Sequence, residues 1–416
     1  MLRTPPLPVP DEPVRAATAA VGGGGAAADP GRPHLMLALA TAGFLVNFWA
    51  WSLLSPLGGQ LRDELQLSSF QQSLLVAVPV LVGSLGRIPV GALTDKLGAR
   101  VMFPAVSLLT ILPVLFLGFA GSTFPRLLLG GFFLGLGGTV FAVGVPFVNA
   151  WFPPAERGLA IGIFGIGMGG TALSAFTTVR LADTFGRAFP FSLVAVLLAA
   201  YAVTARLLIK DPFRERPVTG TFLQRTWATL RMTTTLQLSA LYAVGFGGFV
   251  AFSVYLPTYL RNAYELSAGD AASRTAGFVV LAVIARPVGG WLSDRLHPVP
   301  VLGSCFVAVA ALAGLAALEL SLMPWATIAF LGLAAALGAS SGACFALVAR
   351  VAPPAQVGSV TGVVGAAGGL GGFVPPLLMG VLYGRSGDYT TGYVLLALVA
   401  TAAAVYTLRV VDDVHR

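Results

Sequence analysis

The chain has 416 residues, of which 56% are hydrophobic and only 10% are charged, and its mean hydropathy is +0.85. Soluble proteins carry roughly 25% charged residues, so this composition excludes a soluble globular protein and indicates a polytopic α-helical membrane protein. The formal net charge of +8 does not indicate a nucleic-acid partner, because the basic residues lie in short loops between apolar segments.

Twelve apolar spans follow an N-terminal tail. Residues 1–33 are rich in Pro, Gly and Ala and predict a disordered tail. Each later apolar stretch has the roughly 20 residues that a membrane-spanning helix needs. The first six predicted spans are 35–58, 70–93, 101–120, 126–150, 158–179 and 188–209. The second six are 236–260, 274–293, 299–319, 324–348, 358–382 and 391–410.

A polar loop, residues 210–235, separates the two sets of spans and is the natural linker between them. The predicted fold is therefore an all-α integral membrane protein with twelve transmembrane helices in two halves. The six-helix halves are residues 34–209 and 236–410, and residues 411–416 form a short tail.

The distribution of Lys and Arg predicts the orientation. With the N-terminus inside, sixteen basic residues lie on the inner side of the membrane and seven on the outer side. Inner loops of membrane proteins carry such an excess. We therefore expect a multi-pass protein of the cell (inner or plasma) membrane with both termini and the 210–235 loop in the cytoplasm.

An internal repeat relates the two halves. Three pairs of residues stand 199 positions apart: Arg87 and Arg286, Gly91 and Gly290, and Asp95 and Asp294. The segments that begin at Pro153 and Pro353 repeat at an offset of 200, together with their glycines. Two pairs of segments with almost one offset indicate a duplicated half, as in many transporters.

The loop after the second span, GALTDKLGAR, resembles the loop signature of the major facilitator superfamily, and a weaker copy follows the eighth span. The resemblance implies that superfamily's twelve-helix fold. It also implies that the motif braces the cytoplasmic helix ends and does not touch substrate. The motif residues are Gly91, Asp95, Lys96, Gly98 and Arg100, with Gly290, Asp294 and Arg295 in the second copy.

Arg87 and Arg286 are the two basic residues that lie within spans rather than at or near a span end. An arginine near a helix end can extend to the interface or pair structurally, but each lies eight residues from its aspartate, about 12 Å along a helix. No Asp or Glu lies in the central part of any span. Because an unpaired buried cation costs several kcal/mol, we interpret the two arginines as the site of an anionic substrate.

Spans five and eleven carry glycine strings, 158–170 and 358–372, which favour close helix packing and also let backbone approach a small ligand. Together with Arg87 before Pro89 and Arg286 before Pro287, they resemble the nitrate/nitrite porter family. The resemblance implies that both arginines bind the anion and that aromatic residues flank it. The matching site residues are Arg87, Arg286, Phe141, Phe246, Tyr242 as a hydrogen-bond donor, Gly165, Met168 and Gly369.

Span five departs from the family pattern because it has no Asn. Phe164, Met168 and Gly169 occupy the candidate positions, which leaves the choice between nitrate and nitrite open. The expected partners are the lipid bilayer and a small inorganic anion, nitrate or nitrite, with a proton as a candidate co-substrate. We expect a monomer without cofactor or metal, since Cys305 and Cys344 lie in spans without metal-ligand spacing.

The predicted function is secondary transport of nitrate and nitrite by alternating access, with exchange favoured over proton symport because no span contains His. Within transporters, the alternative is a carrier of small organic anions such as carboxylates, which needs a larger cavity. A non-transporting sensor with a carrier fold would normally carry a folded extension. A membrane enzyme is disfavoured, since no nucleophile or metal set is clustered in the sequence.

Overall fold

The computed structural model describes residues 32–211, 222–353 and 356–411, and within these ranges it contains α-, 3₁₀- and π-helices and no β-strand. The predicted N-terminal tail up to residue 31, residues 212–221 of the predicted linker, and residues 412–416 lie outside the described residues.

The N-terminal half consists of helices that are often broken within one span. Its α-helices are α2 (Arg32–Trp51), α3 (Leu54–Leu65), α4 (Ser69–Leu85), α5 (Arg87–Leu97), α6 (Ala99–Ala120), α7 (Phe124–Leu134), α8 (Val140–Trp151), α9 (Arg157–Phe164), α10 (Gly170–Phe185) and α11 (Phe189–Leu208). Two 3₁₀ segments, η1 (Gly135–Thr139) and η3 (Gly165–Gly169), connect α7 to α8 and α9 to α10.

The C-terminal half has longer, mostly unbroken helices. These are α13 (Thr233–Tyr264), α14 (Ala268–Leu296), α15 (Pro298–Ala316), α16 (Thr327–Val351), α17 (Val357–Ser386) and α18 (Thr390–Tyr406). A further helix, α12 (Phe222–Leu230), lies inside the segment predicted as a linker loop.

Twelve helical segments of the described chain are long and apolar enough to cross a membrane, and each overlaps one predicted span. The predicted twelve-helix all-α fold is confirmed. The first segment runs on to Leu65, beyond the predicted end at residue 58, because α3 continues it after a break at Ser52 and Leu53. Four of the seven residues that α3 adds beyond position 58 are polar or charged, so hydropathy alone ended the span early.

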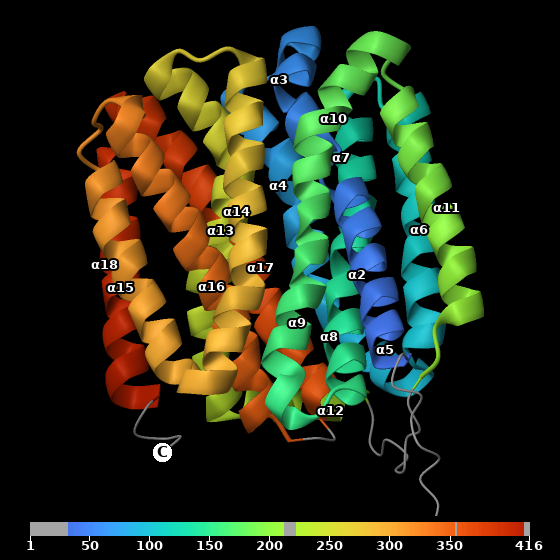
Figure 1. Ribbon diagram of the computed structural model, residues 1–416. Coiled ribbons are helices and arrows are strands. Elements are labelled where there is room, and N and C mark those ends of the chain that lie inside the picture. The colour runs from blue at the N-terminus through green and yellow to red at the C-terminus, as the bar shows by residue number, and fades with distance from the viewer. Residues whose placement is uncertain (1–31, 212–221, 354–355, 412–416) are drawn as a thin grey trace, which may run out of the picture.

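The two halves stand side by side, with the N-terminal half in blue to green and the C-terminal half in yellow to red (Figure 1). We call the end that holds α12 the lower end, and the end that holds α3 the upper end. Between the halves, α17 packs against α4, α5 and α8, while α14 packs against α9 and α10. These contacts bring segments two and eleven together, and likewise segments five and eight.

Glycines allow the two halves to approach closely. A Cβ added to Gly162 of α9 would lie 2.6 Å from the Cα of Pro287, and one added to Gly290 would lie 2.8 Å from the carbonyl carbon of Gly158. Small residues let helix backbones come together where the bilayer offers no hydrophobic drive for association. The glycine strings therefore serve packing between the halves.

Three of the helix breaks occur next to the two arginines. α4 ends at Leu85, with Gly86 between it and Arg87, and the segments η1 and η3 replace regular α-helix by the tighter 3₁₀ form. Glycine weakens an α-helix, and irregular backbone inside a membrane protein is tolerated where it is buried in protein. These breaks leave backbone carbonyls available to side chains.

Candidate functional site

Arg87 lies at the start of α5, fully inside the protein, with 2% of its surface exposed. Its Nε donates to the carbonyl oxygen of Gly138 in η1 at 3.2 Å, and its Nη1 donates to the carbonyl of Gly365 in α17 at 2.6 Å. One guanidinium of the N-terminal half is thus hydrogen-bonded to both halves.

Arg286 is the repeat-related counterpart on α14 and is equally buried, with 2% exposure. Its Nη2 donates to the hydroxyl of Tyr242 at 3.1 Å, and its Nη1 contacts the thioether sulfur of Met168 in η3. Sulfur is a weak acceptor, so Met168 leaves this part of the guanidinium poorly satisfied.

Both arginines lie beside the same two nearly parallel rings. The centroids of Phe141 on α8 and Phe246 on α13 are 6.4 Å apart, with an angle of 18° between the ring planes. The Cζ of Arg87 lies 5.2 Å from each ring centroid, and the Cζ of Arg286 lies 5.8 and 5.6 Å from them. Cations at this distance are attracted to the ring faces.

Tyr242 extends the aromatic wall. Its ring stacks on that of Phe246 at 4.9 Å and 5°, while its hydroxyl is held by Arg286. Phe345 of α16 packs edge-on against two of these rings. The centroid distances are 5.0 Å to Phe141 and 4.7 Å to Tyr242. The structure therefore brings both arginines and all three predicted aromatic residues into one fully buried cluster.

Every partner described for the two arginines is neutral. Carbonyl oxygens, a phenol, a thioether and ring faces surround them, and no carboxylate of the described residues forms an ion pair with either. The cluster therefore carries about two uncompensated positive charges in a region that excludes water, an arrangement that favours an anion.

Glycines on both halves make room for the guanidinium groups. A Cβ at Gly165 would lie 2.9 Å from Nε of Arg286, and a Cβ at Gly365 would lie 3.3 Å from Cδ of Arg87. Gly369, a predicted site residue, lies instead against the side chain of Ser84, one turn before Arg87 on the preceding helix. Gly365 occupies the place beside the arginine.

Sequence reasoning missed Gly138, Gly365 as a carbonyl partner, and Phe345. The paired glycines 137–138 in span four were a usable signal, because glycine pairs at mid-span often mark broken helix. Phe345 had no such signal, since a Phe in a membrane span is usually a packing residue.

At the lower end, the motif aspartates connect the halves. Asp294 accepts a hydrogen bond from the backbone N–H of Leu159 at 2.9 Å, at the N-terminus of α9. Asp95 accepts one from the hydroxyl of Ser359 near the start of α17, at 3.3 Å. We call these two contacts the lower closure. A carboxylate also interacts favourably with the positive end of a helix.

The other motif residues lie around the lower closure without reaching the arginine cluster. Gly98 has φ 82°, which a residue with a side chain rarely adopts, and it begins α6 beside Asp211, whose carboxylate accepts the N–H of Ala99 at 2.7 Å. Gly91 is buried in α5. Lys96, Arg100 and Arg295 are exposed.

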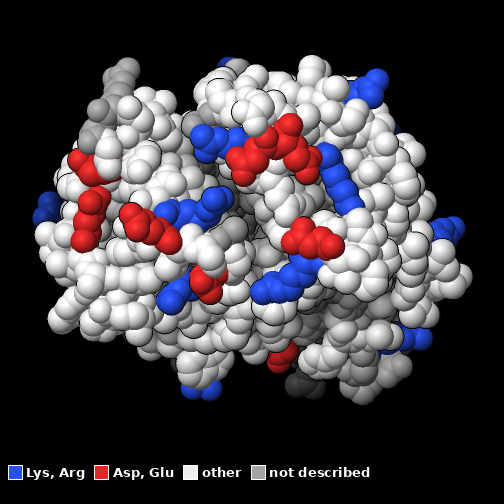
Figure 2. Space-filling model, turned by 90° about the horizontal axis from the view of Figure 1, so that it is seen from above, with Lys and Arg blue, Asp and Glu red and all other residues white. Residues whose placement is uncertain are grey.

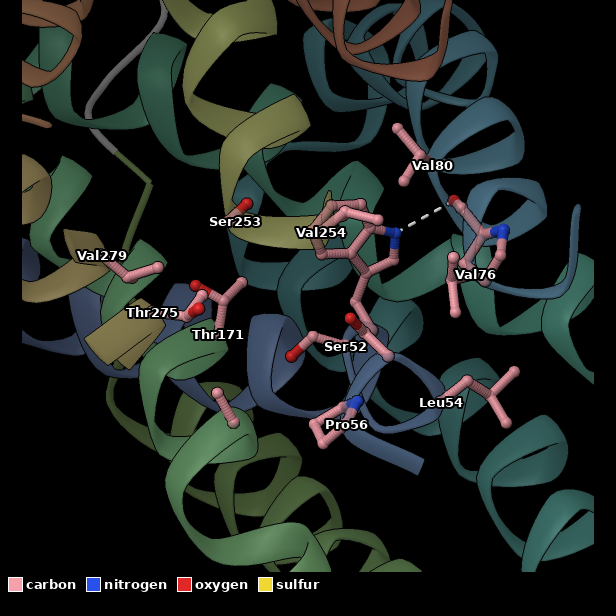
Figure 3. A pocket seen from close by; sticks show the side chains of 14 residues that line it. Ser52, Leu54, Pro56, Val76, Val80, Thr171, Ser253, Val254, Thr275 and Val279 are labelled. Carbon is pink, nitrogen blue, oxygen red and sulfur yellow. Dashed lines mark hydrogen bonds between the residues drawn. The ribbon is translucent and has the colours of Figure 1, made fainter. Parts of the chain in front are cut away.

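At the upper end, a cavity lies between the halves. Its lining includes Ser52, Thr171, Ser253 and Thr275, which come from both halves (Figure 3). Ser253 is seven residues beyond Phe246 on α13, so the cavity lies about 10 Å above the ring pair. From above, the molecule is hollowed near its middle, with basic and acidic side chains around the hollow (Figure 2).

Comparison with known proteins decides the family. The sequence model of the Major Facilitator Superfamily matches residues 40–374 and 266–416. The chain is 50% identical over 374 residues to the probable nitrate/nitrite transporter NarK2 of Mycobacterium tuberculosis, covering 89% of this chain and 95% of that protein. It is 36% identical over 380 residues to the nitrite extrusion protein of Bacillus subtilis, covering 91% and 94%.

The chain belongs to the nitrate/nitrite porter family of the major facilitator superfamily.

The fold of this porter is shared beyond the family. The structure of the human organic anion transporter MFSD10 superimposes with a TM-score of 0.75 at 14% identity, covering 90% of this chain and 99% of that one. At this identity the likeness concerns the fold alone. Together with the twelve apolar helices of its described residues, family membership makes the porter a multi-pass membrane protein, and the two named relatives are transporters rather than enzymes.

Proposed function

We propose that this porter carries nitrate and nitrite across the cell membrane by alternating access, with the anion bound between Arg87 and Arg286. The observation that carries the proposal is a pair of fully buried arginines that share two parallel aromatic rings and have no described carboxylate partner. The two relatives whose names contain nitrate or nitrite support this choice of anion.

The shape of the cluster suits a flat oxyanion. Nitrate and nitrite are planar, and a guanidinium is a planar fork of donors that matches two oxygens at once. One layer of atoms between two rings needs about 7 Å between the ring planes, at roughly 3.5 Å per contact. The ring centroids of Phe141 and Phe246 are 6.4 Å apart, so the ring planes are no farther apart than this and the two halves must separate before a planar ion fits between the rings.

The difference between the two ends supports alternating access. The upper cavity approaches the site between the halves, while the lower closure and the contacts of Gly158 with Gly290 hold the lower end shut. Because the arginine cluster itself is buried, an anion reaches it only when the halves move. The bound ion then leaves downward after the lower closure opens.

Charge favours exchange as the transport mode. When the site changes its access from one end to the other without an anion, two positive charges stay in a low-dielectric region. One bound monovalent anion reduces this to a single net positive charge. Burying an uncompensated charge costs several kcal/mol, so the loaded porter reorients faster than the porter without anion. The titratable groups that drive proton symporters are usually located mid-span, and the central parts of this porter's described spans have no His and no carboxylate; His34 lies at the lower end of the first span.

We therefore expect internal nitrite to stimulate uptake of labelled nitrate into proteoliposomes severalfold. The measurement compares vesicles loaded with nitrite, with an inert organic anion, or with neither, each with and without an inward proton gradient. Accumulation driven by the proton gradient alone, in vesicles without anion substrate, would overturn exchange and establish symport. Absence of nitrate and nitrite transport under all conditions would overturn the proposed function.

The basic-residue distribution supports a cytoplasmic lower end. We expect His34→Cys, exposed at the lower end, to resist a membrane-impermeant maleimide applied to intact cells. Ser122→Cys, exposed at the upper end, should react with it. Both variants are made with Cys305→Ala and Cys344→Ala, and permeabilised cells should label at both positions. Labelling of His34→Cys in intact cells would reverse the orientation.

A further inference from the structure

Several side chains below the arginine cluster have a buried polar atom without a hydrogen-bond partner, and four of these side chains belong together because of their places on the helices that line the site. The atoms are Oγ1 of Thr235, Oγ of Ser239, Oγ1 of Thr361 and Oδ1 of Asn149, and the exposures of their residues are 0, 9, 0 and 5%. Buried polar atoms in native proteins are nearly always paired, so four such groups in one region require an explanation.

Two of these groups lie on the site-facing side of α13. Thr235, Ser239, Tyr242 and Phe246 follow one another at intervals of four, three and four residues, which is the spacing of one helix face. Tyr242 and Phe246 belong to the aromatic wall of the arginine cluster. The hydroxyls of Thr235 and Ser239 therefore continue that face downward, to about 10 Å below Tyr242.

Thr361 likewise lies on the face of α17 that reaches the arginine cluster. It precedes Gly365 by four residues and Gly368 by seven, so the three share one face. A Cβ at Gly365 would contact Arg87 and Phe141, and a Cβ at Gly368 would contact Tyr242 and Phe246. Since α13 and α17 pack along each other, Thr361 lies below the arginine cluster on the neighbouring helix.

Asn149 is the fourth group, on α8. It follows Phe141 by eight residues, about 12 Å further down the helix, and α8 packs against both α5 and α17. The polar groups thus descend from the arginine cluster toward the lower closure on three helices that belong to both halves. We call Thr235, Ser239, Thr361 and Asn149 the lower polar track.

Ordinary helical behaviour does not explain the track. Buried Ser and Thr in membrane helices usually donate to the carbonyl four residues earlier, as Thr110 does to Val106 at 2.8 Å and Thr275 does to Ala271 at 2.8 Å. Thr235, Ser239 and Thr361 make no such bond. Their hydroxyls remain available to a partner from outside the helix.

We propose that the lower polar track is the lower half of the anion route, and that it is buried and unpaired only because the lower end is closed. When the halves open below, its hydroxyls donate to the small oxyanion leaving Arg87 and Arg286, while Oδ1 of Asn149 accepts from the water that accompanies the ion. The proposal rests on the proposed transport function and adds the residues that an anion meets after the arginines.

This role predicts an unusual combination of effects for apolar substitutions. Thr361→Val removes an unpaired buried hydroxyl at nearly constant shape, so the thermal unfolding midpoint should stay unchanged or rise. Exchange of nitrate against internal nitrite should fall roughly tenfold, the size expected when a hydrogen bond to an ion is lost. The apparent affinity for nitrate added at the upper side should change less than twofold, since the arginine cluster is intact.

Thr110→Val is the matched control, because Thr110 is also fully buried but is bonded within α6. It should lose some stability and keep its exchange rate. Ser239→Ala should behave as Thr361→Val does. If Thr361→Val and Ser239→Ala lowered stability and exchanged at the wild-type rate, the groups would be packing elements and the proposal would be overturned.

A second readout does not depend on the anion. Thr235→Cys, with Cys305→Ala and Cys344→Ala, should react with a small thiol reagent applied to the lower side, and faster when Asp294→Asn weakens the lower closure. No reaction of Thr235→Cys in either background would overturn the track. Reaction in a protein that carries neither nitrate nor nitrite would support the track and overturn the proposed substrate.

Discussion

Replacing either central arginine by lysine should weaken nitrate binding by roughly tenfold to more than a hundredfold, and exchange should fall at least as far. Lysine keeps the positive charge but loses the planar fork of donors. In Arg286→Lys, a single ammonium cannot serve both Tyr242 and an anion oxygen with the geometry of the guanidinium. Each charged hydrogen bond lost is worth about 1.5–3 kcal/mol, and 1.4 kcal/mol is a factor of ten in affinity.

Arg87→Lys should have a comparable effect for a different reason. Arg87 bridges the halves by donating to Gly138 on one side and Gly365 on the other. A lysine has a single ammonium in place of the fork, so it cannot donate to both carbonyls with the geometry of the guanidinium. Binding would therefore lose both anion contacts and part of the alignment of the two halves.

Equilibrium binding of labelled nitrate to purified protein, followed by exchange in proteoliposomes, measures both effects. Arg180→Lys is the control, since Arg180 is exposed on α10 and lies over Phe176, away from the cluster. Size-exclusion profiles and thermal unfolding establish that the variants fold. If either central lysine variant bound nitrate as well as the wild type, the site would need only positive charge. The prediction that the planar guanidinium recognises the anion through two hydrogen bonds would then be wrong.

The second large effect concerns closure of the lower end. In Gly290→Ala, the new Cβ would lie 2.8 Å from the carbonyl carbon of Gly158, where backbone meets backbone and no flexible side chain can yield. The two helices must move apart, which also strains the bond from Leu159 to Asp294. We expect this variant to favour a conformation that is open at the lower end, and its exchange rate to fall by an order of magnitude or more. A tenfold change in the ratio of the two conformations requires only about 1.4 kcal/mol.

Gly277→Ala is a matched control on the same helix, because a Cβ at Gly277 meets no atom within 4 Å. It should exchange at the wild-type rate and gain slightly in helix stability. Thiol labelling of a cysteine at position 235 reports the conformational bias directly, with faster labelling in Gly290→Ala than in Gly277→Ala. If the two variants were labelled and exchanged at equal rates, the prediction that Gly290 helps to close the lower end would be wrong.

The arginine cluster shows how much of the candidate site can be predicted from the sequence. The offset shared by Arg87 and Arg286, together with the absence of mid-span carboxylates, predicts a cationic site between the two halves from the sequence alone. The structure places the two arginines against the same pair of rings. Their role in binding an anion remains a prediction until the lysine variants are measured.

The sequence by itself determined the twelve spans, the two-half organisation and the position of the charged residues along each helix. It could do so because lipid forces every backbone polar group into helical hydrogen bonds, and hydropathy then reports helix length and number. Only the tertiary structure decided which carbonyls Arg87 reaches, where Phe345 lies, and which hydroxyls stay unpaired. Those features depend on helix rotation and on breaks at glycine strings, which are set by close packing between helices rather than by the apolar pattern of any one of them.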